Sequence, residues 1–480
     1  MRRVAQNSAF PIVAALGNKG LDLAFALIAL RVLGPADAGR YAFVGVVALY
    51  LDILLGFGMN TWLTREAARQ GERWRTDLAR VLRARAALWV LLTVATTAGA
   101  AAAATASMIS GAEALALGLL AIALAPSGAA AALSALFQAF ERMEYPAAVT
   151  VQTTVLKVAL GLLALALGYG FVGLAAVAIG VNVLTLLSLL VLLRTLALPA
   201  SADGASAAQD SLLGLLRSTS PFMVNNLLAS VFFRADLFLL RPLAGETAAG
   251  WYSAAYRVVD GLTLIPAYFT LALFPGLARR ALLDRAALAR VYARALKALL
   301  TLALPASVAI WLLAEPLVEL LAGRAYLPQS AWALAVLIWF LPFSYINGVT
   351  QYVLIALDRQ RFLTAAFLLA TVVNLGANLV LIPRFGLLAA AALTVVSELV
   401  LLGPFLWAVR RELPELRLLP LAWRPVLAAA AMGTAMAPLV PSAWPLALPL
   451  GAAVYAAVLL ALGGVDAEDR ALLRRLRASS

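Results

Sequence analysis

The chain alternates long apolar stretches with short polar connections along almost its whole length. Fourteen of these stretches are long enough to cross a bilayer as a helix, which takes about 20 residues. They cover residues 9–31, 41–62, 86–107, 113–136, 147–168, 171–193, 221–242, 249–275, 298–322, 329–356, 363–383, 386–408, 425–441 and 444–463. We therefore expect an all-α integral membrane protein with fourteen transmembrane helices, of which the last two are short and interrupted by proline.

The composition agrees with a membrane protein and narrows its chemistry. Hydrophobic residues make up 64% of the chain and charged residues 13%, against about 45–50% and 25% in soluble domains. The chain has no Cys and no His. That excludes disulfides, Cys/His zinc sites, haem held by His or Cys, and catalysis by either residue. We expect no cofactor and no metal. Catalysis by carboxylate side chains is the mechanism that the composition leaves open.

The net charge of +13 is a signal of topology. If the N-terminus lies inside, five of the 37 Lys and Arg fall in outside connections and four within the stretches, which leaves 28 inside. The five outside are Arg31, Arg40, Arg241, Arg324 and Arg384. The positive-inside rule then places both termini in the cytoplasm of a multi-pass inner membrane protein. The positive charge favours anionic membrane lipids as partners and requires no nucleic acid.

Two halves of the chain carry similar segments in the same order. Leu30–Tyr41 reads Leu-Arg-Val-Leu-Gly-Pro-Ala-Asp-Ala-Gly-Arg-Tyr, and Leu240–Tyr252 reads Leu-Arg-Pro-Leu-Ala-Gly-Glu-Thr-Ala-Ala-Gly-Trp-Tyr. We predict a parallel internal repeat of two six-helix lobes, a transporter architecture with the substrate path between the lobes. Chance matching in Gly-, Ala- and Leu-rich sequence is the alternative. The predicted domains are an N-terminal lobe 1–200, a cytoplasmic linker 201–219, a C-terminal lobe 220–410, two further helices in 411–465 and a basic cytoplasmic tail 466–480.

Charged side chains inside the predicted spans are the candidate site residues, because each costs about 2.5–3.5 kcal/mol at the bilayer centre. The cations are Lys19, Lys157, Arg234 and Arg257, and the acids are Asp22, Asp52, Asp236 and Glu398. Polar amides accompany them at Asn18, Asn225, Asn226, Asn347 and Gln351. Pairing within one helix, Lys19 with Asp22 and Arg257 with Asp260, is the structural alternative. The aromatic residues Trp251, Tyr252 and Tyr256 are expected in the membrane interface.

Several segments together resemble a known family. Leu30–Tyr41 is followed by Leu51-Asp-Ile-Leu-Leu-Gly-Phe-Gly58 and Leu63-Thr-Arg-Glu-Ala-Ala-Arg69. The second half opens with Arg234-Ala-Asp-Leu-Phe-Leu-Leu240, Gly250-Trp-Tyr-Ser-Ala-Ala-Tyr-Arg257 and Ala272-Leu-Phe-Pro275. These look like the openings of the two halves of polysaccharide-type, Wzx-like flippases. This branch belongs to the multidrug/oligosaccharidyl-lipid/polysaccharide (MOP) exporter superfamily.

The resemblance implies two six-helix lobes around a central cavity that opens to each side of the membrane in turn. It implies movement of an undecaprenyl-diphosphate-linked oligosaccharide from the cytoplasmic to the outer leaflet, for surface polysaccharide or lipopolysaccharide biosynthesis. Cavity cations would hold the diphosphate, a role that we carry onto the four cations above. The acids would pair with them or bind a coupling ion, H⁺ or Na⁺. Polymerase or glycosyltransferases of the same pathway are the expected protein partners.

Three other functions stay open. A MATE-type multidrug or cation antiporter of the same superfamily would use Asp22 or Asp236 as an ion-linked acid, and the basic residues in the spans disfavour its cationic substrates. A lipid II flippase is the second. A membrane polymerase or glycosyltransferase is disfavoured, because it needs a substantial outward loop and here the outward connections are short. We therefore expect a transporter that is not an enzyme.

Overall fold

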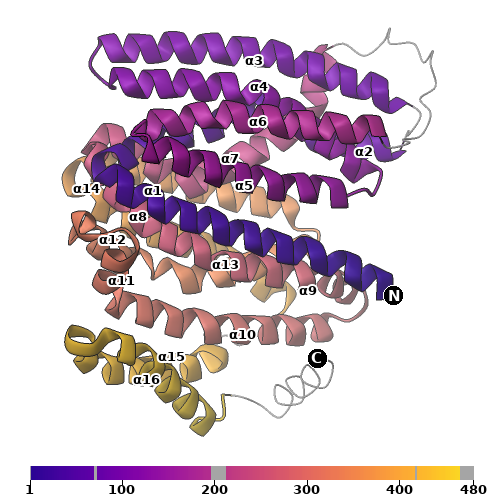
Figure 1. Ribbon diagram of the computed structural model, residues 1–480. Coiled ribbons are helices and arrows are strands. Elements are labelled where there is room, and N and C mark those ends of the chain that lie inside the picture. Colours follow the sequence, from indigo (N-terminus) through magenta and orange to yellow (C-terminus); the bar gives the residue numbers. More distant parts are fainter. Residues whose placement is uncertain (1, 70–72, 196–211, 417–418, 465–480) are drawn as a thin grey trace. The chain divides into compact units, whose positions relative to one another are not determined.

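The computed structural model describes residues 2–69, 73–195, 212–416 and 419–464. Over these residues the regular elements are helices and none is a strand (Figure 1). The predicted all-α fold class is therefore confirmed. The predicted tail 466–480 and residues 201–211 of the predicted linker lie outside the described residues, whereas residues 212–219 form the start of a helix.

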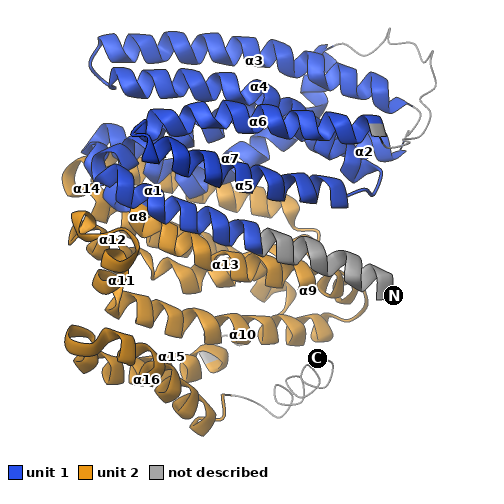
Figure 2. Ribbon diagram, viewed as in Figure 1, with its two compact units in different colours: residues 1–253 blue, residues 254–480 orange. Residues whose placement is uncertain are grey.

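The chain forms two compact units, residues 1–253 and 254–480 (Figure 2). Their boundary falls inside the helix α8 (Glu246–Leu262). The helix α7 (Leu212–Ala244) belongs to unit 1, where it packs mainly against α1 (Arg2–Gly56). The beginning of the predicted C-terminal lobe is thus in contact with the predicted N-terminal lobe within a single unit.

In its described residues, unit 1 contains α7, the start of α8 and six other α-helices. They are α1, α2 (Met59–Arg69), α3 (Trp74–Thr105), α4 (Gly111–Ala139), α5 (Glu144–Ala166) and α6 (Gly170–Thr195). The helices α3, α4, α6 and α5 pack in that order, each against the next (Figure 1). A kink divides α1 at Gly34, whose φ of 71° is readily adopted by glycine. This kink separates the first two predicted spans.

The helix α2 is amphipathic and closes one end of unit 1. Its residues Met59, Trp62 and Leu63 are buried against α3 and α4, where Phe137 completes the apolar cluster. Arg65 and Arg69 lie on its exposed side. Burial of this apolar face is what holds a short helix of 11 residues in place.

Among its described residues, unit 2 holds the rest of α8, eight further α-helices and two short 3-10 helices. The eight α-helices are α9 (Leu264–Leu283), α10 (Arg285–Leu312), α11 (Ala314–Leu321), α12 (Gln329–Leu337), α13 (Phe340–Ala356), α14 (Gln360–Glu412), α15 (Leu419–Met436) and α16 (Val440–Ala461). The long α14 is divided at Gly386, with φ 58°, where the sequence separates two predicted spans. The helices α15 and α16 pack on α10, and the Tyr455 hydroxyl donates to the Thr301 carbonyl at 2.8 Å.

The predicted spans all fall on helices of the described residues. Ten candidate spans are long and apolar enough to cross a membrane, and three of them each contain two predicted stretches. These three are Gly17–Arg69, Gln360–Glu412 and Pro420–Ala461. The predicted stretch 221–242 lies in α7, which carries Arg234 and Asp236 and is not one of the ten. A count of fourteen crossings is compatible with this arrangement.

Candidate functional site

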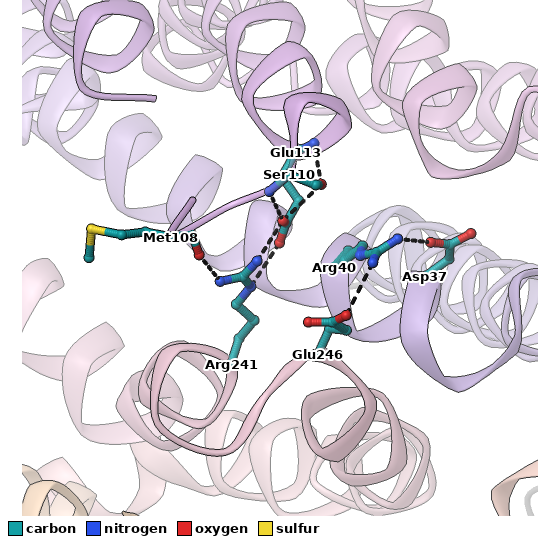
Figure 3. A network of polar contacts seen from close by, with 7 residues as sticks. All are labelled: Asp37, Arg40, Met108, Ser110, Glu113, Arg241 and Glu246. Atoms are coloured by element: carbon teal, nitrogen blue, oxygen red, sulfur yellow. Dashed lines mark hydrogen bonds and ion pairs between the residues drawn. The ribbon is translucent and has the colours of Figure 1, made fainter. Parts of the chain in front are cut away.

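An ion pair joins Arg241, in the last turn of α7, to Glu113, in the first turn of α4 (Figure 3). The arginine Nε donates to Oε1 at 2.8 Å and Nη2 donates to Oε2 at 2.6 Å. The Glu113 side chain is fully buried and that of Arg241 is only 11% exposed. Arg241 also donates to the carbonyl of Met108. Two-pronged pairs shielded from water are the strong form of this interaction, so the pair fixes α7 against α4.

Glu113 also holds the start of its own helix. The Ser110 backbone N–H and hydroxyl donate to Oε2 of Glu113 at 2.7 and 2.9 Å, and the Ser110 oxygen accepts from the Glu113 N–H at 3.2 Å. This is a capping box, which the sequence Ser-x-x-Glu announces. The pairing with Arg241, 128 residues away, has no local sequence signal, and sequence reasoning missed both residues as site candidates.

A second ion-pair cluster lies beside the first (Figure 3). Arg40 of α1 donates to Asp37 at 2.9 Å and to Glu246, the first residue of α8, at 3.1 Å. These side chains are 30–40% exposed, and exposed pairs contribute only about 0–1 kcal/mol. The cluster therefore sets the position of α8 on α1 more than it stabilises the unit.

Two glycines bring these backbones into direct contact. A Cβ at Gly39 would lie 1.8 Å from the carbonyl oxygen of Glu246, and one at Gly250 would lie 1.7 Å from the carbonyl oxygen of Pro35. Real Cβ atoms do not approach so closely, so only glycine fits at either position. Gly39 and Gly250 occupy equivalent places in the two repeated segments, Ala-Gly-Arg-Tyr and Ala-Gly-Trp-Tyr. The repeat motifs thus pack on each other through their small residues, as in other membrane helix contacts.

We expect Gly39→Val to separate α1 from α8. Overpacking costs about 1–3 kcal/mol, which is about a five- to hundredfold shift in the population of the closed contact. The chain has no native Cys, so Arg40→Cys with Glu246→Cys reports the contact through a flexible thiol cross-linker. Cross-linking should fall in Gly39→Val and persist in the control Gly45→Val, where a Cβ meets nothing within 4 Å. Equal cross-linking in both variants would refute the contact.

The structure buries Asp236 beside an aromatic hydroxyl. Asp236 is 4% exposed, and it accepts from the Leu237 N–H at 2.7 Å and from the hydroxyl of Tyr252. Tyr252 is itself fully buried and Tyr256 is 7% exposed. The expectation that these two tyrosines sit in the membrane interface is therefore wrong. They are packing residues, because the small side chains around Gly250 let α8 approach its neighbours.

Lys157 of α5 pairs with Asp22 of α1. The Lys157 side chain is 44% exposed and that of Asp22 is 34% exposed, so both ends of the pair are accessible. Thr153, one turn before Lys157, shares a hydrogen bond of 2.7 Å with Thr185 of α6. The acid that pairs with Lys157 is supplied by α1, because the acid of α5, Glu144, lies in the first turn of that helix. Asp22 therefore bonds Lys157 rather than Lys19, the neighbour that the sequence offered.

Arg85 of α3 is a buried cation that sequence reasoning assigned only to a cytoplasmic connection. Its side chain is 4% exposed, and it donates to Asn60 Oδ1 at 2.7 Å and to the carbonyl of Gly128. Gly128 lies inside α4, two residues after Pro126. Asp52 of α1 is exposed and near enough to feel the charge of Arg85.

Unit 2 contains a buried carboxyl, that of Glu398 in the second half of α14. Glu398 is 3% exposed, and Asn347 of α13, 4% exposed, donates its amide N–H to Oε2 at 2.6 Å and to the Glu398 carbonyl at 2.9 Å. One residue earlier, Ser397 accepts from the Asn374 amide at 2.6 Å. At this level, side-chain hydrogen bonds join the second half of α14 both to α13 and to the first half of α14.

The other predicted site residues are spread over several helices. Lys19 is exposed on α1, Arg257 is exposed on α8, and Arg234 is half-buried on α7. The amides are Asn18, buried on α1, Asn225 and Asn226, exposed on α7, and Gln351, half-buried on α13. Arg257 belongs to unit 2 and the other three cations to unit 1. Convergence of the four cations on one substrate stays a prediction.

Comparison with protein families decides the class of this molecule. A family model described as "Polysaccharide biosynthesis protein" matches residues 4–280, more than half of the chain. The chain belongs to this family. A second family model, MatE, matches residues 221–380. No curated protein sequence matches the chain.

Several solved structures have the same fold as this chain and align with most of its length. A structure titled lipid II flippase MurJ in an inward closed conformation is 14% identical, with a TM-score of 0.76, and covers 94% of this chain and 98% of its own. An inward-facing multidrug resistance MATE transporter is 20% identical at a TM-score of 0.62, covering 82% and 94%. A MOP superfamily transporter from Pyrococcus furiosus is 18% identical at a TM-score of 0.58, covering 84% and 94%. These likenesses show that the chain has the same fold as these transporters.

Proposed function

We propose that this transporter moves a lipid-linked oligosaccharide, carried on undecaprenyl diphosphate, from the cytoplasmic to the outer leaflet of the inner membrane. The polysaccharide family match over residues 4–280 supports a glycan substrate. The excess of Lys and Arg on alternate connections supports cytoplasmic termini. Surface polysaccharide or lipopolysaccharide biosynthesis is the process that such a step serves, with polymerase or glycosyltransferases of the pathway as partners.

The observation that carries the proposal is the accessible pair of Lys157 and Asp22 on membrane-spanning helices. The two side chains are 44% and 34% exposed although they bond each other. A diphosphate bears more negative charge than one carboxylate, so it competes with Asp22 for the Lys157 ammonium. Until the substrate arrives, the ion pair lowers the free-energy cost of having both charges within the membrane.

The network of Figure 3 gives the same proposal a release step. Arg31, Arg40 and Arg241 belong to connections that the positive-inside rule places outside. There, Arg241–Glu113 and Arg40–Glu246 tie α4 and α1 to α7 and α8. We infer that these contacts hold the outer ends of the four helices together and break when the oligosaccharide leaves, as one of the two states of alternating access.

The test is transport by purified protein in phospholipid vesicles. The probe is undecaprenyl diphosphate bearing a fluorescent oligosaccharide, quenched from outside by a membrane-impermeant reductant. We expect the protein to expose the probe on both leaflets within minutes, and not to move the same sugar on undecaprenyl monophosphate. Movement of labelled lipid II would favour a lipid II flippase, and uptake of cationic dyes would favour a MATE-type antiporter. Either result without movement of the diphosphate probe would overturn the proposal.

A further inference from the structure

Glu398 stands apart from the other acids of the membrane-spanning helices. Asp22 is bonded by Lys157, Asp236 by the hydroxyl of Tyr252, and Asp52 is exposed within the field of Arg85. Glu398 is 3% exposed, and the hydrogen-bond donors to its carboxyl come from neutral side chains, the amide of Asn347 and the hydroxyl of Ser344.

The helices that make the main contacts with α14 carry no charged residue. In the described part of the chain these are α12 and α13, and neither contains Lys, Arg, Asp or Glu. The ionisable groups of α13 are two tyrosines: Tyr345 donates to the Leu262 carbonyl, and Tyr352 packs edge-to-face with Phe274.

The charged residues of α14 itself are too distant to neutralise Glu398. They are Arg361, Arg384, Arg410, Arg411 and Glu412. Asn374 marks the level of Glu398 on the first half of α14, because it bonds Ser397. At 1.5 Å per residue, all these charges lie about 15 Å or more away along the helix axis. A fully buried carboxylate without a positive partner is strongly disfavoured and takes up a proton instead.

Asn347 supplies a second, independent observation. Its amide nitrogen bonds Glu398, while its Oδ1 is buried and finds no hydrogen-bond partner within the described part of the chain. A buried acceptor that lacks a donor is costly. An amide turned to present Oδ1 would accept from a protonated carboxyl and be repelled by an ionised one. The Ser344 hydroxyl can likewise accept as well as donate.

We propose that Glu398 is a proton-binding site, occupied by a proton in this conformation and emptied during the transport cycle. Loss of the proton would leave a charge between α13 and α14 that the surrounding neutral residues do not balance. The two helices would then have to admit water or separate. Release of the proton during the cycle rests on the proposed transport function. Occupancy of the site by a proton does not.

The occupied site is tested by infrared difference spectroscopy of the full-length protein in phospholipid vesicles. The wild type should show the carbonyl absorption of a protonated carboxylic acid at neutral pH, and Glu398→Gln should lose it. Glu412→Gln is the matched control on the same helix and should keep the band, because Glu412 forms ion pairs with Arg285 and Arg359. Asn347→Leu keeps the acid and should shift the band.

The result that overturns the site is a wild type without the band at neutral pH, or a band that Glu398→Gln leaves unchanged. Loss of the band on addition of sodium at constant pH would show a sodium site and would also overturn the proton. For the cycle, a pH gradient should speed movement of the diphosphate probe at least tenfold in the wild type and Glu412→Gln, and not in Glu398→Gln. If the band is normal but the pH gradient does not change the rate of probe movement, the proton site stands and only its coupling to transport is refuted. A normal band with no probe movement refutes the proposed function alone.

Discussion

Glu113→Gln is expected to lower the free energy of unfolding by about 3–5 kcal/mol, because it leaves the guanidinium of Arg241 buried without its counter-charge. The pair is almost fully shielded, with side-chain exposures of 11% and 0%. Glutamine can still serve as the third residue of the Ser110 capping box. The variant therefore removes the ion pair while the start of α4 keeps its cap.

The measurement is thermal or denaturant unfolding of the purified protein in one detergent. Glu246→Gln is the control, because its pair with Arg40 is about one-third exposed and should contribute no more than about 1 kcal/mol. The double variant Glu113→Gln with Arg241→Gln should be more stable than Glu113→Gln alone, since no charge is then stranded. If Glu113→Gln is no less stable than Glu246→Gln, the pair is not the clamp that the geometry indicates.

Lys157→Ala is expected to slow movement of the diphosphate probe by about ten- to hundredfold. Hydrogen bonds to charged groups contribute about 1.5–3 kcal/mol, and each 1.4 kcal/mol is a factor of ten. The partial exposure of this pair, 44% and 34%, makes its contribution to folding small by comparison. Transport should therefore fall far more than the amount of folded protein.

The exchange Lys157→Asp with Asp22→Lys separates a structural role from a substrate role. It restores the ion pair between α1 and α5 and moves the cation to the other helix. If the pair is only structural, the exchange should recover transport along with stability. If Lys157 meets the diphosphate, stability should recover and transport should not. Equal rates for Lys157→Ala and the wild type would remove Lys157 from the substrate site.

Much of the fold is readable from the sequence, because lipid imposes a severe rule on the chain. Every backbone group in the hydrocarbon must be bonded within the protein, so each long apolar stretch becomes a helix. The kinks at Gly34 and Gly386 fall where polar or glycine-containing connections interrupt these stretches. The family was readable as well, since its motifs are continuous segments such as Leu30–Tyr41.

The pairings of the charges were not readable, because they join helices that are far apart in the chain. Arg241 reaches Glu113 across 128 residues, Lys157 reaches Asp22 across 135, and Arg40 reaches Glu246 across 206. Local spacing favoured Lys19 for Asp22, since residues three apart share a helix face. The packing of α5 on α1 brings Lys157 to it instead.

The sequence by itself determined that this protein is a helical membrane protein of the polysaccharide family, with its charges concentrated at the ends of its helices. Tertiary structure alone decided which of the remaining charges are neutralised. The acids of the spans look alike in the sequence, but the packing gives Asp22 a lysine as its partner and gives Glu398 the neutral amide of Asn347. The reason is physical: hydropathy is a property of each segment, whereas the cost of a buried charge depends on which neighbours the packing supplies.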